Sequence, residues 1–119
     1  MRQLLVLALA AAAAFPAAAQ DRAPVARRTL ADLAWVLGQS HGLAQVCDTA
    51  SQTWRARMIR LVELEHPDPA FRGQLFSGFN AGYASAQAAY PRCGGRSRAA
   101  YAQAVARGRD LARVLSAAR

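Results

Sequence analysis

Apolar residues recur every three or four positions along most of the chain, which is the spacing of one face of an α-helix. No stretch of alternating apolar and polar residues is long enough to predict a strand. The pattern predicts one helix over residues 30–47, a second through residues 54–62, a third over 69–90 and a fourth from about residue 97 to 115. Because the connections are short, we expect an all-α fold, a small up-down bundle of about four helices.

Capping residues mark the ends of these helices. Thr29 begins the sequence TLAD, which predicts a capped helix start. The sequence HPDP ends the second helix, and Asp68 followed by Pro69 is typical of an N-cap and a first-turn proline. Pro91 stops the third helix, and Ser97 can cap the fourth.

The first predicted helix is apolar on more than one side, with only Asp32, Gln39 and Gln45 clearly polar on the outside. Such a helix is central rather than peripheral. The second helix instead has one apolar stripe, and Glu65 falls at its end. We expect a neighbouring arginine to satisfy that carboxylate.

Small residues lie four positions apart on the first and third helices. Gly38 and Gly42 share a face of the first helix, and Gly78 and Gly82 share a face of the third. Each glycine costs about 1 kcal/mol relative to alanine in a helix, so a compensating contact is expected. One interpretation is close packing of the two backbones. The alternative is a small-ligand pocket between the helices, formed by these glycines with His41 and Tyr83.

His41 lies within an apolar stripe, where an imidazole should be hydrogen-bonded or functional. We expect a satisfied core histidine, with a ligand-binding role as the alternative. The only other histidine, His66, has Glu65 and Asp68 nearby, but their spacing matches no recognised metal site. We therefore predict no metal, no cofactor and no catalytic residues, because no nucleophile elbow, phosphate loop or paired carboxylates occur.

The first nineteen residues have the build of a secretory signal peptide: Arg2, an apolar run, Pro16 and a small-residue motif ending at Ala19. An uncleaved membrane anchor is the alternative. Cleavage would leave a lead over residues 20–28, expected to be flexible, and one helical domain over 29–119, with no membrane-spanning segment. The predicted location is the periplasm.

The two cysteines, Cys47 and Cys93, both lie in the exported part of the chain. In an oxidising compartment such a pair is most simply a structural disulfide. In an up-down bundle the first and third helices point the same way, so Cys47 and Cys93 fall at the same end. The predicted topology and the predicted disulfide therefore agree.

The chain has fifteen arginines, no lysine and seven acidic residues, for a net charge of +8. Export argues against nucleic acid, so an envelope protein or an anionic envelope surface is the expected partner. Arg98, Arg109 and Arg113 form a candidate basic surface on the fourth helix. Genome composition is the alternative explanation of the arginine content.

Three segments, LAWVLGQSHGLAQVC, WRARMIRLVELE and FNAGYASAQAAYPRC, resemble a family of short exported proteobacterial proteins known only as a domain of unknown function. The resemblance covers about residues 30–113. It implies export and paired cysteines, and it carries no catalytic residues.

These observations favour a non-enzymatic periplasmic protein that acts as an adaptor or accessory subunit through a basic surface. The alternatives are a small-ligand-binding module at the first and third helices near His41, and a binder of anionic envelope polymer or lipid. The oligomeric state stays open.

Overall fold

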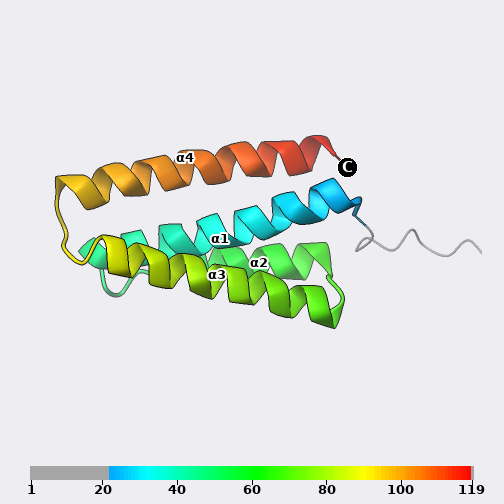
Figure 1. The fold of residues 1–119 in the computed structure, drawn as a ribbon, viewed down its shortest axis with the longest axis horizontal. Coiled ribbons are helices and arrows are strands. Elements are labelled where there is room, and N and C mark those ends of the chain that lie inside the picture. The colour runs from blue at the N-terminus through cyan, green and yellow to red at the C-terminus, as the bar shows by residue number, and fades with distance from the viewer. Residues whose placement is uncertain (1–21, 119) are drawn as a thin grey trace, which may run out of the picture.

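The structure, a computed structural model, describes residues 22–118, so the predicted signal peptide and residues 20–21 lie outside the described part. Four helices follow one another: α1 (Pro24–Cys47), α2 (Thr53–Glu65), α3 (Pro69–Ala89) and α4 (Gly95–Ala117). They alternate in direction along one long axis (Figure 1). No strand forms within residues 22–118. The predicted all-α up-down bundle is confirmed.

Two predicted helix starts are wrong. α1 begins at Pro24 rather than Leu30, because a proline at the first position has a backbone already suited to a helix. Residues 24–28, expected as part of a flexible lead, are therefore helical, and the Thr29 hydroxyl donates to the Val25 carbonyl oxygen within the helix. α4 begins after Gly94, and the Ser97 hydroxyl accepts a hydrogen bond from the Gly94 backbone N–H at 3.0 Å. The cap at the start of α3 is as predicted, with Asp68 Oδ1 accepting from the backbone N–H of Phe71.

α1 is the central helix, as its apolar pattern predicted. It packs against each of the other three helices and has its most extensive contact with α3. In Figure 1 it runs between α4 and the pair α2 and α3. Its buried residues spread around the helix instead of following one stripe; they are Leu30, Leu33, Ala34, Val36, Leu37, Gly38, Ser40, His41, Gly42 and Leu43.

Glycines bring the backbones of α1 and α3 into direct contact. A Cβ atom at Gly38 would overlap the carbonyl oxygen of Phe79, and one at Gly82 would overlap the carbonyl oxygen of Trp35. A Cβ atom at Gly42 would lie 2.8 Å from the carbonyl oxygen of Tyr83. We call Gly38, Gly42 and Gly82 the glycine seam. At these positions the geometry is that of close packing, which offsets the cost of glycine in a helix.

The predicted disulfide between Cys47 and Cys93 is present at one end of the bundle. The two Cα atoms are 4.8 Å apart, and the residues are 46 positions apart in the chain. Cys47 is the last residue of α1, and Cys93 lies in the connection between α3 and α4. The disulfide therefore ties the end of the central helix to the start of α4.

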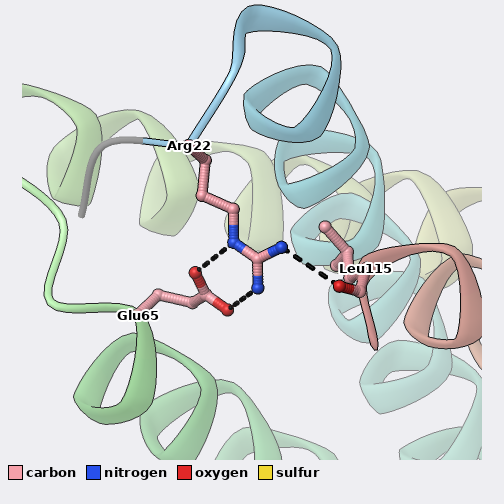
Figure 2. A network of polar contacts seen from close by, with 3 residues as sticks. All are labelled: Arg22, Glu65 and Leu115. Carbon is pink, nitrogen blue, oxygen red and sulfur yellow. Dashed lines mark hydrogen bonds and ion pairs between the residues drawn. The ribbon is translucent and has the colours of Figure 1, made fainter. Parts of the chain in front are cut away.

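A buried ion pair joins the elements at the opposite end (Figure 2). The Arg22 guanidinium donates to both carboxylate oxygens of Glu65, at 2.9 and 2.8 Å, and to the backbone carbonyl oxygen of Leu115 at 3.1 Å. The side chains of Arg22 and Glu65 are only 10% and 5% exposed. The arginine expected beside Glu65 is thus Arg22, which comes from the predicted lead and links the end of α2 to the end of α4.

The glycine seam generates a first prediction. Gly82→Ala should lower the free energy of unfolding by about 2–3 kcal/mol, because the added methyl group meets backbone that cannot move aside. Gly73→Ala, in the same helix, is the matched control: nothing lies within 4 Å of its added methyl group, so stability should rise by up to about 1 kcal/mol. Chemical denaturation of both oxidised variants measures the difference. Equal effects at the two positions would contradict the close-packing interpretation.

The buried ion pair generates a second prediction. Arg22→Met removes the two-point ion pair with Glu65 from a buried site, which should cost about 3 kcal/mol of stability. Arg28→Met, at an exposed arginine of α1 that makes no ion pair with a described residue, should change stability by less than about 0.5 kcal/mol. Thermal and urea unfolding compare the two. A cost for Arg22→Met as small as that of its control would show that the ion pair does not stabilise this end of the bundle.

Candidate functional site

The residues predicted to form a pocket between α1 and α3 do come together, but largely as packed neighbours. The glycine seam is filled by backbone atoms, so no ligand fits between the helices at Gly38, Gly42 or Gly82. Gly78 has more room, with the nearest atom 3.8 Å from an added Cβ. The Tyr83 hydroxyl donates to Gln45 Oε1 at 3.0 Å, which links α3 to α1 beside the seam.

His41 is buried, with 6% of its surface exposed, but it is not the satisfied core histidine that was expected. Its Nδ1 atom has no hydrogen-bond partner among the described residues. The imidazole lies against two aromatic rings of α3, with centroid distances of 5.6 Å to Phe79 and 5.2 Å to Tyr83. Burial lowers the pKa of His41 below its ordinary value of 6.5, and the positive charge of Arg55 lowers it further. The neutral imidazole is therefore favoured.

The predicted basic surface on α4 is exposed, although its arginines are less close together than expected. Arg98 and Arg109 are eleven residues apart, which is about 16 Å along a helix. Arg98 lies beside the disulfide, 3.7 Å from Cys93 Sγ, and Arg113 pairs with Asp110 at 3.8 Å. Arg98 at the start of α4 is therefore separate from Arg109 and Arg113 near its end.

A feature that sequence analysis missed is an open groove between α2 and α3. Both helices pack against α1, but they make at most a weak contact with each other, and the space between them has a volume of about 870 Å³. We call this space the α2–α3 groove. Its lining residues are Arg55, Met58, Ile59, Val62, Glu63, His66, Pro67, Arg72, Phe76, Phe79 and Asn80.

The lining of the groove combines an apolar floor with charged edges, which hold two arginines and the acid Glu63. Met58, Val62 and Phe79 are buried core residues, whereas Ile59 is 42% exposed. Neither Arg55, from α2, nor Arg72, from α3, makes an ion pair with a described residue. The groove can therefore bind a group that is apolar in part and negatively charged in part.

The groove and the buried His41 have a neighbouring residue in common. Phe79 lines the groove and also contacts the His41 ring, and Arg55 lies close enough to His41 to affect its pKa. The predicted residue His41 thus contacts one residue of the groove floor, and Tyr83 contacts His41.

The residues considered for a metal site have other roles. Glu65 binds Arg22, and Asp68 caps α3 and lies 3.6 Å from Arg27. No group of three histidine, cysteine or acidic side chains within residues 22–118 could hold a metal ion. None of the helices in the same range is both long and apolar enough to cross a membrane.

A known protein family matches most of the chain. The family described as "Protein of unknown function (DUF2385)" matches residues 26–118. The chain belongs to this family. The chain's membership of the family that its sequence resembles is therefore confirmed. The match covers α2, α3, α4 and all of α1 except its first two residues, and it includes the disulfide and the α2–α3 groove. No curated protein and no solved structure matches.

His41 generates a third prediction, on pH dependence. Because the folded-state pKa is below 6.5, the unfolded chain binds a proton more readily, so His41 lowers stability progressively as the pH falls below about 6.5. His41→Leu, which has a similar volume and cannot be protonated, should reduce the loss of unfolding free energy between pH 7 and pH 5. The exposed His66 provides the control, as His66→Asn keeps a residue that tolerates the left-handed backbone there. Urea titrations across this pH range measure the unfolding free energy of both variants. If stability depended on pH in His41→Leu as it does in the unmodified protein, His41 would not be the source of the loss.

Proposed function

We propose that the protein is a non-enzymatic adaptor of the cell envelope that holds an acidic partner protein in the α2–α3 groove. The observation that carries this proposal is the open groove itself, which has apolar residues along its floor and an arginine without an ion pair in each wall. Binding sites for proteins commonly combine an apolar centre with charged edges.

The charge of the surrounding surface supports an acidic partner. Arg57 extends the positive charge of α2 beyond the groove and is exposed, whereas the exposed Arg60 is paired with Glu63 at 3.8 Å. The Arg57 guanidinium lies 4.3 Å from the centre of the Trp54 ring, so the indole holds that charge at the surface. Complementary charges of this kind speed association and select the partner.

The arrangement of nucleophilic side chains supports binding over catalysis. The Ser40 hydroxyl donates to the Val36 carbonyl oxygen at 2.8 Å within α1, so it is directed away from its neighbour His41. The titratable residues of the groove, Glu63 and His66, are exposed, and Glu63 lies 3.8 Å from Arg60. A general base needs a nucleophile within hydrogen-bond reach, and this groove presents no such pair among its lining residues.

The predicted signal peptide and the disulfide support a location outside the cytoplasm. Disulfides persist in oxidising compartments, of which the periplasm is one. A partner in the same compartment is an envelope protein.

The proposal is tested by capturing the partner in the native host with two double variants of equal charge change. Arg55→Glu with Arg72→Glu reverses the groove, and Arg107→Glu with Arg109→Glu reverses two exposed positions on α4. After crosslinking in cells and purification of the tagged protein, mass spectrometry quantifies the recovered partner.

We expect the groove variant to reduce recovery of one recurrent protein by about tenfold or more, corresponding to about 1.4 kcal/mol, while the α4 variant retains it. Circular dichroism checks that both variants are folded. Loss of the partner only in the α4 variant would show that the partner binds α4 and not the groove. Recovery of lipid or envelope polymer instead of a protein would contradict the proposed class of partner.

A further inference from the structure

We infer that the α2–α3 groove binds an amphipathic α-helix that presents two acidic side chains about two turns apart with apolar residues between them. This inference rests on the proposed function and specifies what part of the partner enters the groove. It depends on three features of the groove: its walls, the spacing of its charges and the position of its apolar residues.

The walls favour a helix over an extended strand. Both walls are helices, whose backbone N–H and C=O groups already bond within α2 and α3. An extended peptide lying in the groove would find no backbone partners there, and buried backbone groups without partners are costly. A helix satisfies its own backbone groups and contacts the groove only through side chains.

The two arginines lie near opposite ends of the groove. α2 and α3 run antiparallel and are joined by a short connection, so the end of α2 and the start of α3 lie at the same level. Arg55 is ten residues before the end of α2, and Arg72 is three residues after the start of α3. At 1.5 Å per residue their levels differ by about 10 Å, which is about two turns of helix.

The apolar residues of the groove lie between these charges. Ile59 follows Arg55 by one turn, and Phe76 follows Arg72 by one turn, so both lie near the middle of the groove and at about the same level. The order along the groove is therefore a cation, an apolar pair and a second cation, and Glu63 of α2, which is ion-paired within its own helix, lies at about the level of that second cation. The complementary helix has an acid at one position, apolar residues three and four positions later, and a second acid seven positions after the first.

A cation–π contact positions Arg72, the second cation of the groove. The Arg72 guanidinium lies 5.6 Å from the centre of the Phe76 ring, so the aromatic ring supports the cation beside the apolar pair. At the other end, Asn80 adds a hydrogen-bonding side chain to the wall near the level of Arg55. Both ends can therefore receive a carboxylate.

Synthetic peptides test the inference with the oxidised mature protein. The probe is an 18-residue blocked peptide of Ala and Gln with Glu at positions 6 and 13 and Leu at positions 9 and 10. One matched control moves the second Glu to position 11, on the opposite face, and another replaces a central Ala with Pro to break the helix. NMR titration of the ¹⁵N-labelled protein measures affinity and location together.

We expect the probe to shift the resonances of Ile59, Phe76 and Asn80, and each control to bind at least about tenfold more weakly. Arg55→Glu with Arg72→Glu should abolish these shifts. Equal binding of the proline peptide would overturn the helical occupant, and shifts confined to α4 would overturn its location. If cells lose the partner in the groove variant but the probe does not bind, the inference fails and the proposed function stands. If neither responds, both fail.

Discussion

The direct contact between the backbones of α1 and α3 is the constraint on which the rest of the bundle depends. The glycine seam lets the two helices approach until the carbonyl oxygens of one lie where side chains of the other would otherwise stand. This contact fixes α3 on one side of α1, while α2 and α4 occupy its remaining apolar surfaces. The α2–α3 groove follows from this arrangement, because α2 and α3 share a neighbour without packing closely on each other.

Links at the two ends hold the arrangement in place. The Cys47–Cys93 disulfide joins α1 to the connection before α4, and Arg22 joins the ends of α2 and α4 (Figure 2). The groove lies along α2 and α3 between these links, so its walls are held in a fixed relation to the central helix. A preformed site loses less freedom on binding than a flexible one, which suits an adaptor.

The sequence predicted those features that depend on one helix or on one pair of positions. Helical spacing predicted the four helices, and the apolar sides of residues 30–47 predicted the central helix. The pair of cysteines predicted the disulfide, and the predicted helix directions agreed with it. The start of α1 differs from the prediction because Pro24 begins the helix about one and a half turns before the capping pattern at Thr29. The signal for the Arg22 contact was Glu65, an acid on an apolar stripe, but which arginine would reach it depended on the helical course of residues 24–28.

The groove was beyond prediction from the sequence for a different reason. Ile59 and Phe76 are exposed or half-buried because of the way α2 and α3 are placed around α1, and helical spacing does not specify that placement. Two features of the sequence hinted at the groove. Ile59 lies off the main apolar stripe of α2, and Arg55 and Arg72 each precede an apolar residue by one turn. His41 was correctly placed in the core, but its unpartnered Nδ1 atom depends on which side chains α3 brings to it.

Site-specific photo-crosslinking in cells tests whether an acidic protein binds in the α2–α3 groove, as proposed. A photoreactive phenylalanine analogue is placed at Ile59 in the groove or at Val114 on α4, which are exposed apolar positions of comparable accessibility. We expect a crosslink from Ile59 to an acidic segment of a single protein, with little or no such product from Val114. Crosslinks from Val114 alone, or from Ile59 only to lipid or polymer, would contradict it.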